Sequence, residues 1–480
     1  MLVKIHKSIY YLIILFIFVA ALYLRSYAYI QFRPLWHDEC SLAINILNKN
    51  FLDFFSNLSH EQYAPPLFMI FTKILTLIFG MKEAVFRFLP FIFSIFSIPL
   101  FYIFSKKFLE RKISIITANL LFCINYYLIY YSQEFKQYSS DVLVFLLIFI
   151  IISKINFKKT PDKKIILSGF LLSLLSLFSF SSLFIIGAFI LVELLSNKNN
   201  TKPVLKFSIP VCFAFIFYFL SIILQSKNNF ILNYWDKGFL SFNFSKIIVF
   251  IQTNLQYYFY PNKTILFILI LIVTGFFIIA KNYKNKNNMY LITICIFAIS
   301  ASILKLYPIF QRVSLYLIPI LIILLIKPLD IISRKKKTLS VTLILLIFFS
   351  LKAYNFSYLY KIKSLSNRNY DARTITKKLY ENYKDDLIII NRASDSEFLY
   401  YSKYYDFKTD NFIFIETPNN DKNLYMQTLN SIPKNQKVWF YYINDYSHSP
   451  VIFILKEWIQ DKEILYQYEK NGSCIFHINL

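Results

Sequence analysis

The sequence has few charged residues, and its hydrophobic segments contain almost none of them. Of the 480 residues, 16% are charged and 57% are hydrophobic. Apart from Lys73, and from Glu193 near the end of its segment, the apolar runs have almost no charge at mid-depth. Ion-coupled transporters usually need ionisable groups at the membrane midplane. This shortage argues against a transporter and places any chemistry at the membrane surface.

Cysteine is also scarce, and no zinc-binding pattern is present. The sequence has five cysteines, and no spacing of cysteine and histidine suggests a zinc site. Three of them lie within apolar runs, where small buried residues are ordinary. Cys40 and Cys474 lie outside these runs, far apart in the sequence, and nothing in the sequence supports a bond between them.

Long hydrophobic runs, in contrast, recur along most of the chain. A membrane-spanning helix needs about 20 apolar residues, so these runs predict a polytopic membrane protein. The first run follows MLVKIHK and has no small-residue cleavage site after it, which indicates an uncleaved first span. The runs lie roughly at 8–30, 66–80, 87–107, 111–131, 138–153, 164–180, 181–196, 204–224, 263–280, 289–304, 312–327 and 338–352.

The positions of the lysines indicate the topology. The net charge of +25 could suggest nucleic-acid binding, but much of the lysine falls in short loops between spans, as the positive-inside rule describes. The run 66–80 is short and contains Lys73. If it does not cross, five basic loops share the side of the N-terminus. We therefore predict about eleven spans in the plasma membrane, a cytoplasmic N-terminus, and an interfacial helix at 66–80.

The chain then divides into two predicted domains. Residues 1–352 form the transmembrane domain, with a long first outer loop at 31–86. Residues 353–480 form a small extracytoplasmic α/β domain. Within it, NYDARTITKKLYENYKDD has the pattern of an amphipathic helix, and DLIIINR, NFIFIE, KVWFYYIN and SCIFHIN have the pattern of strands.

The segment LWHDEC places two adjacent acids, Asp38 and Glu39, just after the first span. They are either solvated loop acids or part of a catalytic site at the membrane surface. Trp36 beside them is a residue type found at membrane interfaces, and the loop that follows is rich in aromatics. The Pro-Pro pair at 65–66 fits the start of the 66–80 helix, since proline is tolerated at a first helical position.

Further polar residues lie on the predicted outer side. Glu134, Tyr138 and Asp141 share one face if the helix near 138 extends back by one turn. A polar helix end is the other reading.

Three cations also lie on this side, namely Arg87, Lys305 and Arg312. They either reach the lipid headgroups or hold a phosphate of a lipid substrate, for which the planar arginine fork is well suited.

These motifs together resemble a known family. WHDE, APPL, Arg87 with FRFLPFIFSIFSIPLFYIFSKKF, NLLFCINYYLIYYSQEFKQY and LYPIFQRVSLYLIPI occur in that order. This arrangement is similar to the bacterial family 39 glycosyltransferases of the GT-C fold, which are related to protein O-mannosyltransferases and to the aminoarabinose transferase of lipid A. The resemblance covers most of residues 8–330, and the C-terminal domain resembles that of the family only loosely.

The resemblance implies transfer of a sugar from a polyprenyl-phosphate donor to an acceptor on the outer face. Asp38 matches the catalytic acid, Glu39 the acid beside it, Glu134 the second acidic position and Arg312 the basic position for the lipid phosphate. Many relatives carry His or Lys where this chain has Ala64. The remaining predicted substrate contacts are Lys305, Arg87, His37, Tyr63, Tyr138 and Asp141.

The chemistry suggests a mechanism for such a transfer. The lipid phosphate leaves easily, so the acceptor hydroxyl mainly needs a base, for which we select Asp38, and direct attack inverts the anomeric centre. A divalent metal fits this chemistry without being required. The partners are then the donor, membrane lipids and a protein, lipid or glycan acceptor, with no nucleic acid. The alternatives are a transporter or flippase, a polymerase of lipid-linked glycans, and a membrane-anchored binding protein.

Overall fold

The structure is a computed structural model that describes residues 7–226, 234–259, 265–335, 371–416, 422–443, 450–470 and 473–480. The chain folds into two compact units. Unit 1 comprises Met1–Ile30, Ala64–Ile70 and Arg87–Tyr360, and unit 2 comprises Gln31–Tyr63, Phe71–Phe86 and Lys361–Leu480. Most of the first outer loop therefore packs with the C-terminal segment.

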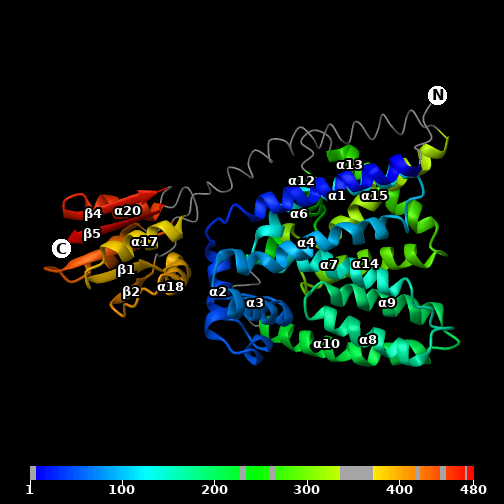
Figure 1. Cartoon of the computed structure of the whole chain (residues 1–480), viewed down its shortest axis with the longest axis horizontal. Helices are drawn as coiled ribbons and strands as arrows, with labels where there is room; N and C mark the ends of the chain where they lie inside the picture. The colour runs from blue at the N-terminus through cyan, green and yellow to red at the C-terminus, as the bar shows by residue number, and fades with distance from the viewer. Residues whose placement is uncertain are drawn as a thin grey trace. The chain divides into compact units, whose positions relative to one another are not determined.

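Unit 1 is a bundle of helices (Figure 1). Two shorter helices, α2 and α3, connect its first two long helices, and α3 begins at Pro66 as the sequence predicts. The helices up to residue 335 are α1 Lys7–Tyr29, α2 His37–Asn48, η1 Leu52–Phe55, α3 Pro66–Phe79, α4 Glu83–Ser105, α5 Lys112–Ile124, α6 Tyr126–Tyr130, η2 Tyr131–Gln133, α7 Tyr138–Ile152, α8 Asp162–Ser176, α9 Ser182–Ser196, α10 Lys202–Ser226, η3 Asp236–Gly238, α12 Phe244–Phe259, α13 Ile265–Lys281, α14 Lys286–Ile303, η4 Gln311–Leu317 and α15 Ile318–Lys335.

Several of these helices can cross a membrane. Among the described residues, α1, α4, α14 and Gln311–Ser333 are long and apolar enough, and the bent pair of α5 and α6 makes a fifth if it counts as one span. Others are shorter, such as α7 and α9 with 15 residues each. The chain is a multi-pass membrane protein, but the predicted number of eleven spans is not confirmed. The predicted span at 338–352 lies outside the described residues.

Polar contacts bring basic loops of unit 1 to one end of the bundle. Asp330, near the end of α15, is fully buried and accepts hydrogen bonds from the backbone N–H groups of Glu110 (3.2 Å) and Arg111 (2.9 Å) in the loop before α5. In the first turn of α5, the Lys112 Nζ lies 5.6 Å from the centre of the Tyr10 ring, near the start of α1. These contacts place the loop 106–111 beside the beginning of the first helix.

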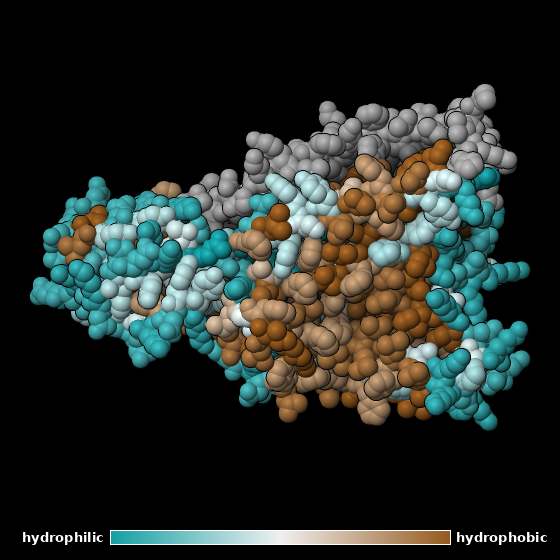
Figure 2. All heavy atoms as spheres, viewed as in Figure 1, coloured by the Kyte–Doolittle hydropathy of each residue, from teal (hydrophilic) through white to brown (hydrophobic). Residues whose placement is uncertain are grey.

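Two further contacts join the other loops in pairs. The buried carboxylate of Glu193, at the end of α9, accepts hydrogen bonds from Lys286 Nζ (2.9 Å) and from the Tyr290 hydroxyl on α14. On the surface, Lys206 of α10 pairs with Asp162 at the start of α8. Figure 2 shows hydrophobic side chains covering the visible helices of unit 1 and hydrophilic side chains gathered at one end of them. This pattern is typical of a membrane-embedded bundle.

The run 111–131 is broken rather than continuous. The helices α5 and α6 meet at Asn125 with a bend of 48°. The Asn125 side chain accepts a hydrogen bond from Leu128 N (3.2 Å) and donates one to the Tyr258 carbonyl (2.9 Å). Arg25 of α1 donates to the Cys123 carbonyl (3.0 Å), which lies in the last turn of α5. A cation at a helix C-terminus is favourable, so Arg25 supports the break.

The C-terminal part of unit 2 is a five-stranded sheet with helices on both faces. The strand order is β2-β1-β3-β5-β4, where β1 is parallel to β2 and β3, and β5 is antiparallel to β3 and β4. All four predicted strands and the predicted helix are confirmed. The elements are α17 Ala372–Asn382, β1 Leu387–Asn391, η5 Arg392–Ser394, α18 Asp395–Tyr404, β2 Phe412–Ile415, α19 Lys422–Asn430, β3 Lys437–Tyr442, α20 Pro450–Ile459, β4 Glu463–Lys470 and β5 Ser473–Asn479.

The two faces of this sheet have separate cores. On one face, Val438 and Phe440 of β3 belong to a buried cluster with residues of α19 and α20, including Leu429 and Trp458. On the other face, the Tyr441 hydroxyl hydrogen-bonds the side chain of Thr376 on α17 (2.8 Å). Alternate residues of one strand thus point to opposite helical layers, as strand geometry requires.

We expect Asp330→Ala to destabilise unit 1. The substitution leaves two backbone N–H groups without their acceptor and removes the partner of Lys327, whose Nζ lies 3.7 Å from the carboxylate. Breaking a buried ion pair by removing one partner costs about 3 kcal/mol. Thermal unfolding of the purified protein in detergent measures the loss.

Asp162→Ala is the matched control, because the Asp162 and Lys206 side chains are 56% and 45% exposed. Such a surface pair contributes about 0–1 kcal/mol. Equal losses in the two variants would contradict the role assigned to Asp330.

Candidate active site

The predicted site residues divide between the two units. His37, Asp38, Glu39 and Tyr63 belong to unit 2. The others belong to unit 1, namely Arg87, Glu134, Tyr138, Asp141, Lys305 and Arg312.

The acids of WHDE lie in the first turn of α2, where the helix dipole favours negative charge. Their surroundings differ. Glu39 is fully buried, and its Oε2 accepts a hydrogen bond from the Trp36 backbone N–H (3.3 Å), which precedes the helix. Asp38 is half-buried. Glu39 therefore helps to cap α2, and Asp38 is the more accessible of the two acids.

The two histidines of the outer loop meet acids from the C-terminal segment. His37 Nδ1 lies 3.0 Å from Oε2 of Glu397, and His60 Nδ1 lies 3.8 Å from Oδ2 of Asp395. Burial alone would lower the pKa of His37, but the Glu397 carboxylate outweighs this effect and, with Asp38 and Asp395, raises the pKa to about 9. His37 is therefore a cation at neutral pH and is held beside Asp38.

Lys73, the isolated charge in the run 66–80, has a clear structural partner. Its Nζ donates hydrogen bonds to the carbonyls of Ile46 (2.8 Å) and Lys49, at the C-terminal end of α2. The same Nζ lies 5.9 Å from the ring centres of Phe51 and Phe54. A cation in this place satisfies terminal carbonyls and complements the helix dipole. The sequence shows the odd charge, but its partners lie too far along the chain to be inferred.

Tyr63 lies in the loop between η1 and α3. Its side chain is partly buried, and burial, with a smaller contribution from Glu61, raises the pKa of its hydroxyl. The tyrosine is therefore neutral and is able to donate a hydrogen bond at physiological pH.

The expectation that Glu134, Tyr138 and Asp141 share a helix face is wrong. The helix α7 begins at Tyr138, and Glu134 precedes it with an extended backbone (φ −119°, ψ 130°). The buried Asp141 carboxylate accepts a hydrogen bond from the Ser179 hydroxyl (2.6 Å), between α8 and α9. Glu134 is also buried. The helix does not extend back because η2 and the residues after it form a separate turn.

Two of the three predicted cations converge on the segment 234–236. Arg312 Nη2 donates to the Tyr234 hydroxyl (3.3 Å), and its guanidinium lies 5.9 Å from the centre of the Trp235 ring. Lys305 Nζ lies 3.4 Å from Asp236 in an exposed pair. Arg87 is buried in the first turns of α4. Arg312 and Lys305 thus share one neighbourhood.

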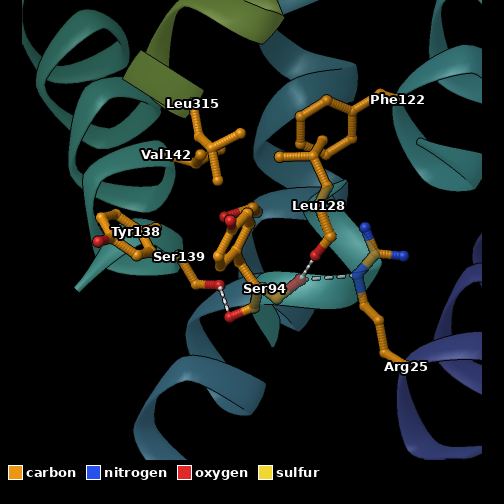
Figure 3. A pocket seen from close by; sticks show the side chains of 10 residues that line it. Arg25, Ser94, Phe122, Leu128, Tyr138, Ser139, Val142 and Leu315 are labelled. Carbon is orange, nitrogen blue, oxygen red and sulfur yellow. Dashed lines mark hydrogen bonds between the residues drawn. The ribbon is translucent and has the colours of Figure 1, made fainter. Parts of the chain in front are cut away.

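A cavity in unit 1 adjoins the second outer segment. It is small and is lined by residues from α1, α4, α5, α6, η2, α7 and η4. Figure 3 shows Arg25 at its edge, with the guanidinium Nε bonded to the Ser94 hydroxyl (2.7 Å). Tyr138 and Ser139 line the same space. In the sequence, Arg25 is distinguished only by being a charge within the first apolar run, and its partners on α4 and α5 lie too far along the chain to be inferred.

The described residues do not provide an evident metal site. They contain no group of three or more His, Cys, Asp and Glu side chains that could hold an ion. Cys40 and Cys474 are both buried.

The sequence matches no protein-family model and no curated protein. Among solved structures, ArnT from Cupriavidus metallidurans bound to undecaprenyl phosphate has a TM-score of 0.55 at 10% identity, over 96% of this chain and 97% of that chain. The apo state of the same protein gives 0.54 at 11% identity, with the same coverage. The Archaeoglobus fulgidus oligosaccharyltransferase in complex with zinc and sulfate gives 0.51 at 12% identity, over 97% of this chain and 73% of that chain.

The chain has the GT-C fold. Both neighbours are glycosyltransferases of this fold, and the likeness covers nearly the whole chain. The fold that the motif resemblance implied is confirmed.

We expect Lys73→Met to loosen the C-terminal turn of α2. Methionine keeps most of the apolar stem but removes the donors to Ile46 and Lys49, and loss of a helix cap costs about 1 kcal/mol. Hydrogen exchange of the full-length protein should show faster exchange at residues 45–49. Lys82→Met, at an exposed position just after α3, the helix that carries Lys73, is the control and should leave this exchange unchanged.

Proposed function

We propose that the protein is a membrane glycosyltransferase that moves a sugar from a polyprenyl-phosphate donor to an acceptor on the outer face of the membrane. The observation that carries this proposal is the half-buried Asp38 at the start of a helix, beside a buried capping Glu39, in a chain with the GT-C fold. One structure of the neighbour ArnT contains undecaprenyl phosphate, which supports a lipid-phosphate donor.

Asp38 is the general base in this proposal. The acceptor hydroxyl must lose a proton as it attacks the anomeric carbon, and a carboxylate within hydrogen-bond reach can take it. The bond from the anomeric carbon to the phosphate oxygen breaks as the new glycosidic bond forms. Attack from the face opposite the phosphate inverts the anomeric centre.

Arg312 and Lys305 receive the leaving phosphate. Negative charge builds on the lipid phosphate as the bond breaks, and cations placed there in advance stabilise it. The arginine fork can pair with two phosphate oxygens, and Tyr234 and Trp235 hold the guanidinium from one side. Glu134 is a second acid of the site by its place in the family motif.

The membrane orientation follows from the same reasoning. The basic loops that gather at one end of unit 1 would face the cytoplasm, in accord with the positive-inside rule. The outer loop and the C-terminal domain, which belong to one compact unit, would then be extracytoplasmic, where lipid-linked donors and the acceptor meet.

The primary test is turnover of lipid-linked sugars. Purified protein in nanodiscs is supplied with a panel of polyprenyl-phosphate monosaccharides and a crude acceptor extract, and release of lipid phosphate is followed. Turnover of one donor would identify the sugar and support the proposal. No turnover of any donor would count against a lipid-monophosphate donor and favour a flippase or a binding protein.

We expect Asp38→Asn to reduce transfer by about 10²–10⁴-fold, because removing a general base costs that much. Donor binding, measured separately by equilibrium binding of the radiolabelled lipid, should change little. Glu61→Gln serves as the control, since it neutralises an exposed acid of the same loop. Full activity of the Asp38 variant would remove this residue from the mechanism.

We expect Arg312→Gln to weaken donor binding. A hydrogen bond to a charged group contributes about 1.5–3 kcal/mol, which corresponds to a rise in the donor KM of about 10–100-fold. The KM for the acceptor should stay the same. An equal rise in both KM values would instead indicate a general disturbance of the outer face.

A further inference from the structure

The helix that carries Asp38 is short. It is 12 residues long, and the Glu39 side chain caps its start through the Trp36 backbone N–H. Isolated helices of this length are marginal in water even when they are capped. Contacts with other parts of unit 2 therefore add to the cap in holding its first turn.

Most of these contacts come from α18, in the C-terminal segment. Near the first turn of α2, the His37 ring meets Glu397 (3.0 Å), and the Ser41 hydroxyl donates to the Ser396 hydroxyl (2.9 Å). The Leu35 backbone N–H, just before the helix, donates to the Tyr401 hydroxyl (2.8 Å). The two helices lie side by side, and every one of these bonds comes from α18.

A fourth contact joins the other ends of the two helices. Lys403 Nζ, near the end of α18, donates to the Asn48 side chain at the end of α2 (2.5 Å). The contacts therefore run along both helices from their first to their last turn, which fixes rotation as well as position.

The position of α18 relative to the sheet explains how this helix can contact α2. The chain goes from β1 to β2 on one side and then crosses back to β3 on the other, so the strand order reverses between β1 and β3. Open α/β sheets usually bind ligands outside the carboxyl ends of strands at such a point. Here α18 starts directly after β1 and η5, and its first turn contacts the outer loop of the same chain.

Among the contacts between α18 and α2, the one between Glu397 and His37 stands out because both side chains are charged. Glu397 is 2% exposed, and a buried carboxylate is costly without a partner. The other charged groups around His37 are Asp38 and Asp395, and Asp395 in turn lies within 4 Å of His60 and Arg392. The arrangement places a histidine cation beside the buried acid of α18 and the half-buried acid of α2.

We propose that Glu397 is a positioning residue for the reaction: through His37 it fixes the first turn of α2 and aims the carboxylate of Asp38. This inference deepens the proposed function and rests on it for the role of Asp38. It assigns to the C-terminal domain the task of holding the catalytic loop, in addition to any part it has in choosing the acceptor.

The contact implies a pH dependence with a definite sign. Folding raises the pKa of His37 from 6.5 to about 9, so the stability that the charged contact contributes is complete below pH 6.5 and decreases above it, and the contact itself loses its charge as the pH rises through about 9. Transfer by the wild-type protein should therefore decline near pH 9. Without the Glu397 charge, the pKa of His37 should move down towards its ordinary value of about 6.5.

The test compares Glu397→Gln with wild type in the full-length protein. Glutamine keeps the size of the side chain and removes its charge. We expect kcat to fall by about 10–100-fold, since small displacements of a reacting group have effects of this size, while the donor KM stays the same. The alkaline decline should move towards pH 6.5. Glu416→Gln, at a side chain that is 82% exposed, is the control.

Hydrogen exchange separates this inference from the proposed function. Residues 37–41 should exchange faster in Glu397→Gln and in His37→Gln, and the double variant should add little to either single one. The two variants could exchange faster while the wild-type protein turns over no donor. That result would support the positioning of α2 and would count only against the proposed reaction. Exchange at the wild-type rate, or an active variant with an unchanged pH profile, would overturn the inference.

Discussion

The packing of α2 against α18 is the interaction on which the arrangement of unit 2 depends. The outer loop contains only short helices, and although Glu39 and Asn45 find partners within the loop, other polar groups do not depend on the loop alone. Residues of α18 bind Leu35 and His37 near the beginning of α2, and Lys73 satisfies carbonyls at its end. The conformation of the WHDE segment thus depends in part on a helix far along the chain. This dependence gives the C-terminal domain a structural role that a free acceptor-binding module would lack.

In unit 1, buried polar groups determine which helices and loops are held together. Lipid chains are as apolar as leucine, so hydrophobic contacts alone do not select which helices become neighbours in a membrane. The buried Glu193 joins α9 to α14, and the buried Asp330 joins α15 to the loop before α5. Both acids meet partners in basic loops. The lysines and backbone amides there therefore bind specific helices, besides any influence on membrane orientation.

The sequence allowed prediction of those features that depend on local composition. Apolar runs locate most of the long helices but neither α2 nor α12, and β-branched and aromatic runs locate β1, β2, β3 and β5. The strand β4 cannot be predicted in this way, because its segment EILYQYEK is mostly exposed and rich in polar residues. The break at Asn125 cannot be predicted either, because neither proline nor glycine marks it. The partners of His37 and Lys73 cannot be inferred, since no local pattern links residues so distant in the chain.

The two adjacent acids illustrate how helix geometry separates roles that the sequence leaves equal. Successive residues of an α-helix point in directions about 100° apart, because each turn contains 3.6 residues. In α2 the buried part begins at Glu39, and every residue from there to Ile46 is buried. Glu39 lies in this part and caps the helix, whereas Asp38 remains partly exposed. The buried acid therefore helps to hold the helix start, and the more accessible neighbour is the acid to which the proposed reaction assigns the role of base.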